Sequence, residues 1–163
     1  MEDQMKENTR LFLKVVIAHV FTYTLCGIIA MNLFSYWDWI HEQNNWRGMD
    51  DIITQLALVF QILRGILYGI VILLLKDTII YSKYGIIKLF VIMAILGFFN
   101  TPAPSPGSIE GFIFMKPQPQ DAPPLNILIG GHMEIFIQNL LFCIIVCTKW
   151  KELYYRIRNK RNV

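Results

Sequence analysis

The sequence predicts an all-α, polytopic membrane protein, a four-helix transmembrane bundle with a proline-rich extracytoplasmic loop. Hydrophobic residues make up 55% of the 163 residues, and the mean hydropathy of +0.44 is high for a soluble domain. Four apolar segments also have about the length that crosses a bilayer: residues 11–34, 51–75, 84–99 and 126–148. Because the hydrocarbon core offers the backbone no hydrogen-bond partner, each segment should be a helix. We therefore expect one membrane domain over residues 1–163.

Basic residues flank these segments unevenly and predict their orientation. They gather before and at the start of the first segment, around the second turn and after the last segment: Lys6, Arg10, Lys14, Lys76, Lys83, Lys88, Lys149, Lys151, Arg156, Arg158, Lys160 and Arg161. The positive-inside rule then places both termini and the second turn in the cytoplasm. The net charge of +3 fits contact with anionic lipid and does not argue for nucleic acid. The basic tail, 149–163, should be a cytoplasmic interfacial helix.

The second segment carries an arginine in the middle of an apolar run. A guanidinium at the bilayer centre costs at least about 2.5–3.5 kcal/mol on insertion scales, so it normally faces a bundle interior and finds polar partners. Gln61, Arg64 and Tyr68 recur at helical spacing and share one face. We expect that face to point inward.

Polar side chains in the first and last segments are the expected partners of this arginine. His19, Tyr23 and Cys26 form a narrow stripe on the first helix, which should also turn inward. In the last helix Glu134 should lie about 6 Å above Arg64 along the membrane normal, if both segments are centred in the bilayer. The sequence therefore predicts an ion pair between Arg64 and Glu134, because each would otherwise be a buried lone charge.

The predicted binding site surrounds this pair and has three interpretations. Its expected members are Arg64, Glu134, Gln61, Tyr23, Gln138 and Asn139. The pair could be purely structural, fixing packing and register. It could bind a lipid head group or a small anionic ligand, since the flat fork of arginine suits carboxylate or phosphate. It could also take part in a proton-coupled step with Glu134 as the titrating group.

The connection from residue 100 to 125 contains all seven prolines of the chain. Proline fixes φ and removes a hydrogen-bond donor, so extended segments and turns are expected at its two ends. Its centre, GSIEGFIFM, is apolar, and a solvated linker would not need such residues. We expect a short cap over the outer end of the bundle. The second turn is short, so the second and third helices should be antiparallel neighbours, with the third facing lipid.

No cofactor, metal or catalytic group is expected. His19 and His132 fall at different depths and cannot both bind one haem. The chain has neither an HExxH nor a CxxC motif. The three cysteines are predicted to be small residues that pack between the helices. Glu134, Glu110 and His132 would be the acid–base residues of a membrane enzyme, which is the third of the functional alternatives.

Two short motifs resemble a family of small four-span bacterial membrane proteins. They are QILRG at residues 61–65 and PSPGSIEG at residues 104–111. That family pairs an arginine-glycine in the second span with a proline-GSIEG loop before the fourth. The resemblance implies a bacterial inner membrane, and it implies that Arg64, Ser108 and Glu110 belong to one site. It implies no reaction.

We therefore expect a non-enzymatic inner-membrane protein that binds a lipid head group or a small anionic ligand from the outer side. The alternative is an accessory or assembly subunit whose polar core is structural. The expected partners are membrane lipid, a small anionic ligand, and either further copies of the chain or a membrane partner subunit.

Overall fold

The computed structural model describes residues 2–34, 52–96 and 125–148, and every regular element within these ranges is a helix. Three of the described helices are long and apolar enough to cross a membrane. They are α1 (Glu2–Phe34), α4 (Ala57–Leu74) and α8 (Leu125–Cys147). The described part of the chain is thus all-helical, with helices of membrane-spanning length.

The third predicted segment is described only in part. Helix α6 (Gly85–Ala94) has ten residues, which at about 1.5 Å per residue is half of what a bilayer requires. The remainder of the predicted span beyond residue 96 lies outside the described residues. The same holds for the proline-rich connection up to residue 124 and for the basic tail, so the predicted cap and interfacial helix stay predictions.

Helix α1 is longer than its apolar segment. It begins at Glu2, whereas hydropathy placed the start of the span at residue 11. Glu2 and Asp3 in the first turn suit the positive end of the helix dipole, and Lys6 Nζ donates to Glu2 Oε1 at 2.6 Å, one turn earlier. At about 1.5 Å per residue the whole helix is roughly 50 Å long, so its first turns extend beyond a hydrocarbon layer of about 30 Å.

The second predicted segment is interrupted at both ends. A short helix, α3 (Ile52–Gln55), precedes α4, and α5 (Lys76–Ile79) follows it. Leu75, between α4 and α5, has φ −103° and ψ 13°, and its carbonyl accepts from Thr78 N at 3.0 Å. This tighter turn ends α4 and redirects the chain toward α6.

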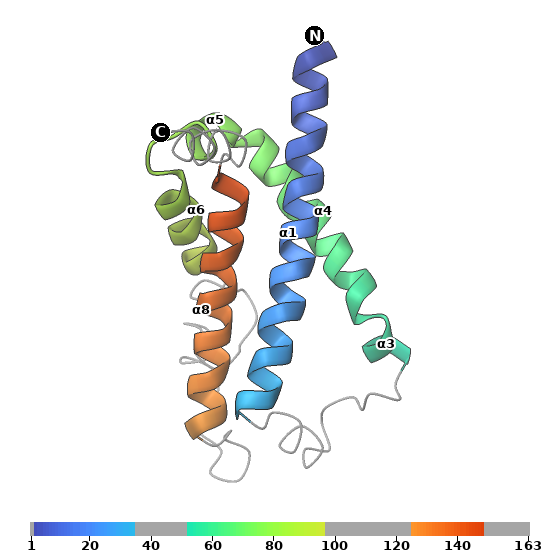
Figure 1. Cartoon of the computed structure of the whole chain (residues 1–163), viewed down its shortest axis with the longest axis vertical. Coiled ribbons are helices and arrows are strands. Elements are labelled where there is room, and N and C mark those ends of the chain that lie inside the picture. Colours follow the sequence, from blue (N-terminus) through green and yellow to red (C-terminus); the bar gives the residue numbers. More distant parts are fainter. Residues whose placement is uncertain (1, 35–51, 97–124, 149–163) are drawn as a thin grey trace, which may run out of the picture.

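Helix α1 is the element on which the others assemble (Figure 1). Helices α4 and α8 both pack against it and run antiparallel to it, and α6 packs on α8. The spatial order is therefore α4, α1, α8, α6. The second and third helices were predicted to be antiparallel neighbours. The described part of the third, α6, is not a neighbour of α4, because α5 and the turn after it carry the chain away from α4 and onto α8.

The buried side chains gather toward the end of the molecule where α1 begins. The main cluster joins all of the larger helices and α5: Val15, Ala18, Ile72, Ile79, Leu89, Phe142, Cys143 and Val146. Lys14 Nζ donates to the carbonyl oxygens of Val146 and Thr148 at 2.7 and 2.8 Å, which ties the start of α1 to the end of α8. At the opposite end α4 diverges from α1 (Figure 1).

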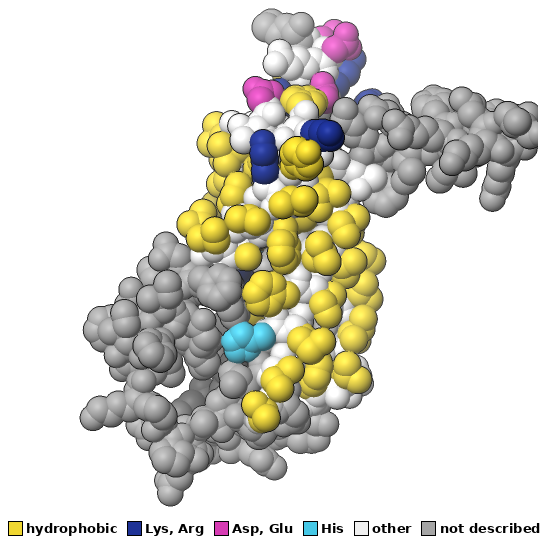
Figure 2. Space-filling model, turned by 90° about the vertical axis from the view of Figure 1, so that its left-hand side faces the viewer, with side chains coloured by type: hydrophobic (Ala, Val, Ile, Leu, Met, Phe, Trp, Pro, Cys, Tyr) yellow, Lys and Arg dark blue, Asp and Glu magenta, His cyan; other side chains and the backbone are white. Residues whose placement is uncertain are grey.

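The outer surface is apolar along the middle of the molecule. Figure 2 shows a face on which hydrophobic side chains cover the middle, while charged side chains gather toward the end where α1 begins. Leu74 is 80% exposed and Leu33 is 69% exposed. Such exposure is unfavourable in water but ordinary in a bilayer, because lipid tails are as apolar as leucine.

Candidate functional site

Two glycines determine where α4 meets α1. A Cβ atom on Gly65 would lie 3.2 Å from the Cα of Val16, and one on Gly69 would lie 2.7 Å from the ring of Phe12. The missing side chains allow the two backbones to approach closely, as in the small-xxx-small packing of membrane helices. Gly65 and Gly69 form a GxxxG motif, GILYG, which is the sequence signal that could have predicted this contact.

His19 occupies the centre of the polar cluster beside this crossing. It is 2% exposed, and its Nε2–H donates to Oε1 of Gln61 at 3.1 Å. Its ring meets the edge of the Tyr68 ring at a centroid distance of 4.9 Å and the Phe142 ring at 6.1 Å. His19 is therefore a buried, hydrogen-bonded residue between α1, α4 and α8. The stripe predicted to turn inward is confirmed for His19 and for Cys26, which is 5% exposed.

Arg64 lies at the edge of this cluster and is exposed, although its face was predicted to point inward. Gln61 and Tyr68, on the same face of α4, are half-buried. Arg64 Nε donates to the hydroxyl of Tyr68 at 3.1 Å, and its Cζ lies 5.8 Å from the centre of that ring. Among the described residues no other hydrogen bond or ion pair of Arg64 occurs. The terminal nitrogens of the guanidinium thus remain available at the surface.

The predicted ion pair between Arg64 and Glu134 is not formed among the described residues. Gly65, beside Arg64, packs on Val16, whereas a Cβ on Gly27 would lie 3.6 Å from Oε1 of Glu134. Val16 and Gly27 are three turns apart on α1, so the two charges differ in depth by about 15 Å. The prediction assumed that both spans are centred at the same depth, but the GxxxG contact moves α4 toward the start of α1.

Glu134 lies in the α1–α8 interface and is half-buried. No described residue donates a hydrogen bond to its carboxylate. Gln138 and Asn139, on the same helix, are also half-buried, as is Tyr23 on α1, whose ring lies 6.3 Å from that of His19. The structure therefore brings Tyr23 near the cluster formed by His19, Gln61, Arg64 and Tyr68, which we call the Arg64 cluster, and it places Glu134 farther along α1, against Gly27.

Two members of the predicted site, Ser108 and Glu110, lie outside the described residues. Within the described ranges no three His, Cys, Asp or Glu side chains converge in the manner of a metal site.

Comparison with known proteins gives no identity. No family model, curated protein or solved structure matches the chain. Function has to be inferred from the side chains themselves. The group that most needs an explanation is Arg64, because a cation is exposed on a helix of membrane-spanning length and has only the Tyr68 hydroxyl as a hydrogen-bond partner among the described residues.

Proposed function

We propose that this protein is a non-enzymatic membrane protein that binds an anionic group at Arg64. The ligand is the phosphate or carboxylate of a lipid head group or of a small solute. The observation that carries the proposal is the exposed Arg64 guanidinium, which uses its Nε for Tyr68 and keeps its terminal nitrogens free of described protein partners.

An anion is the ligand that best satisfies such a group. The guanidinium is always charged, and its planar fork can donate two parallel hydrogen bonds to a carboxylate or phosphate. The Tyr68 hydroxyl accepts the hydrogen bond from Arg64 Nε and so helps to orient the two terminal nitrogens of the guanidinium. In turn, His19 packs against the Tyr68 ring and binds Gln61, so the side chains behind the arginine are held in place.

The register of the helices favours access from the side on which α1 begins. Arg64 is level with about residue 17 of α1, whose apolar run starts at Leu11, so it lies roughly 9 Å inside that boundary. An arginine side chain can extend over most of this distance toward the head groups. We therefore propose that the ligand reaches Arg64 from the side of the membrane on which α1 begins. The sequence had suggested the opposite side, beneath the outer loop.

We further propose that the chain crosses the bacterial inner membrane four times, with both termini in the cytoplasm. The support is the basic flanks together with the opposite directions of α1 and α4. Ser108 and Glu110 would then lie on the outer side, away from Arg64.

A second candidate, an accessory subunit, uses the same exposed arginine. In that case an acidic side chain of another membrane polypeptide would pair with Arg64. A second copy of this chain fits less well. In a two-fold dimer about the membrane normal, Arg64 would face the Arg64 of its partner at the same depth, while Glu134 would lie about 15 Å away along the normal.

Native mass spectrometry of the protein in mild detergent tests this proposal. The wild type should carry a bound lipid or small anion that is lost from Arg64→Leu, and Arg64→Lys should hold it more weakly because it keeps the charge without the fork. Arg10→Leu is the matched control, since it removes an exposed cation from the start of α1 and should retain the ligand. Helicity by circular dichroism establishes that each variant is folded.

The outcomes separate the two candidates. Equal binding by wild type and Arg64→Leu would refute the proposed site. A second polypeptide that accompanies the wild type and is absent from Arg64→Leu would instead favour the accessory subunit.

A further inference from the structure

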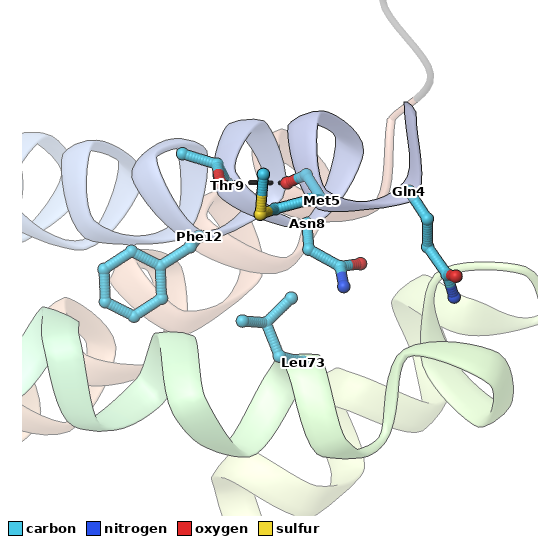
Figure 3. A pocket seen from close by; sticks show the side chains of 6 residues that line it. All are labelled: Gln4, Met5, Asn8, Thr9, Phe12 and Leu73. Carbon is cyan, nitrogen blue, oxygen red and sulfur yellow. Dashed lines mark hydrogen bonds between the residues drawn. The ribbon is translucent and has the colours of Figure 1, made fainter. Parts of the chain in front are cut away.

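A groove lies between the first turns of α1 and the last turn of α4, on the opposite side of α4 from Arg64. Its volume is about 400 Å³, and it is lined by Gln4, Met5, Asn8, Thr9, Phe12 and Leu73. In Figure 3 Phe12 lies at one end of the groove and Gln4 at the other, while Leu73 projects from α4 between them, opposite Asn8. Leu73 follows Arg64 by two and a half helical turns, which places the two on opposite sides of α4.

The lining changes from polar to apolar along the groove. Gln4, Asn8 and Thr9 precede Leu11, where the apolar run of α1 begins. Phe12 lies within the apolar run of α1, and Leu73, opposite Asn8, adds the end of the apolar run of α4. The groove therefore crosses the level at which head groups give way to hydrocarbon, and its polarity changes in the direction that a phospholipid needs.

The apolar end of the groove has a closed floor and an adaptable rim. The ring of Phe12 covers Gly69, where α1 and α4 are in close contact. Met5, two turns before Phe12 on the same side of α1, is 64% exposed, and methionine readily adjusts to an irregular apolar surface. The first methylene groups of an acyl chain can lie along this floor, and the rest of the chain continues into the bilayer.

The polar end lies beside a cation. Lys76 Nζ donates to Asn8 Oδ1 at 2.9 Å, which holds the ammonium next to the lining and leaves further N–H donors. Two nearby carboxylates are engaged elsewhere, since Glu7 accepts from the Tyr81 hydroxyl and Glu2 pairs with Lys6. Asp77 is exposed at the start of α5. An anionic phosphate can thus meet both the ammonium and the Asn8 amide.

We propose that this groove binds one glycerophospholipid with an anionic head group, its phosphate at Asn8 and Lys76 and the start of an acyl chain between Phe12 and Leu73. The lipid belongs to the leaflet at the end where α1 begins. This site uses none of the residues of the Arg64 cluster.

The test is lipid retention by the purified protein in mild detergent, offered an equimolar mixture of phosphatidylglycerol and phosphatidylcholine with the same acyl chains. Native mass spectrometry then counts the bound lipids. Leu73→Trp fills the groove and should abolish retention of one lipid. The matched control is Leu74→Trp, which adds the same side chain at a position that is 80% exposed and outside the groove, and it should retain the lipid.

Two more variants test the head-group contact and the independence of the site. Lys76→Gln should reduce the preference for phosphatidylglycerol by about fivefold, the effect expected of one basic side chain at an anionic surface. Arg64→Leu should leave this lipid bound even if it abolishes the ligand of the Arg64 site. Retention by Leu73→Trp at the wild-type level, or equal loss from Leu74→Trp, would overturn the proposal.

A measurement on the wild-type chain covers the case in which Leu73→Trp does not fold. A phosphatidylglycerol with a photoactivatable group near the start of its acyl chain should label the part of α1 that contains Met5 and Phe12. Labelling only of other segments would contradict the proposed groove.

Discussion

At the scale of single residues, Lys14 is a side chain whose removal should destabilise the fold. The last carbonyls of a helix have no partner within the helix, and Lys14 supplies charge-assisted hydrogen bonds to two of them, on Val146 and Thr148. Lys14→Met should therefore lower the free energy of unfolding by about 1–2 kcal/mol. Unfolding in increasing fractions of a denaturing detergent, followed by circular dichroism, measures this difference.

Lys6→Met is the control for that measurement. Lys6 makes an ion pair with Glu2 within α1, and both side chains are exposed. Exposed pairs of this spacing contribute little, so the variant should unfold close to the wild type. Equal destabilisation by the two variants would mean that the contacts of Lys14 with α8 do not stabilise the fold.

Tyr81 links the turn after α5 to the start of α1 and should titrate abnormally. Its hydroxyl donates to Glu7 Oε1 at 2.8 Å. This hydrogen bond raises the pKa of Tyr81 above the ordinary value of about 10, and the nearby charges of Glu7 and Asp77 act in the same direction. The contribution of the bond to stability is therefore complete below about pH 10 and is lost as pH rises through the folded-state pKa.

The tyrosinate absorbance of wild type minus that of Tyr81→Phe isolates this titration. Its midpoint should lie above that of a free tyrosine, and Glu7→Gln should bring it down because the negative acceptor is gone. A midpoint that Glu7→Gln does not move would show that the contact with α1 is not made in solution.

At the scale of elements, the contact between α1 and α4 depends on Gly65. A side chain at this position would meet the backbone of Val16, which cannot move aside as a flexible side chain can. Gly65→Leu should therefore separate the two helices and destabilise the protein by about 1–3 kcal/mol. The same detergent titration measures the loss.

The matched control is Leu67→Ala on the same helix, at a position that is 56% exposed. It also changes a side chain of α4 but has no backbone opposite it, so it should have a small effect. Wild-type stability of Gly65→Leu would refute the close crossing and, with it, the depth assigned to Arg64.

The bounds of the elements were predictable to different degrees. Helix α8 begins and ends within a residue of the apolar segment 126–148, because prolines precede this segment and an unbroken apolar run fills it. The start of α1 was missed because hydropathy locates the membrane boundary and not the end of a helix. Its first turns lie outside the apolar run and are stabilised by their own dipole and side-chain contacts.

In the candidate site, the residues that share a helix face were predictable from the sequence, whereas the depth of one helix relative to another was not. Helical spacing correctly grouped Gln61, Arg64 and Tyr68, because side chains separated by three and four residues share a face in any helix. The pairing of Arg64 with Glu134 required the depth of one helix against another. That register is set by close contacts such as Gly65 on Val16, which the hydrophobic pattern does not reveal.

At the scale of the whole molecule, the directions of the helices constrain the path of the chain. The hydrogen bond of Lys14 to Val146 joins the start of α1 to the end of α8. The hydrogen bond between Asn8 and Lys76 joins the start of α1 to the start of α5, just after α4. At the other end a Cβ on Gly130 would meet the ring of Phe34. The end of α5 and the start of α8 therefore lie at opposite ends of the molecule, and α6 runs from the first toward the second (Figure 1).

This geometry predicts an even number of membrane crossings although only three described helices have spanning length. In a background with the native cysteines replaced by alanine, single cysteines at Asp3 and Asp77 should react with an impermeant maleimide from one side. A cysteine at Leu125 should react only from the other side, because that residue begins α8 at the far end. The three positions are exposed, so access and not burial decides the result. Labelling of all three from the same side would mean that α8 does not cross the bilayer as α1 does.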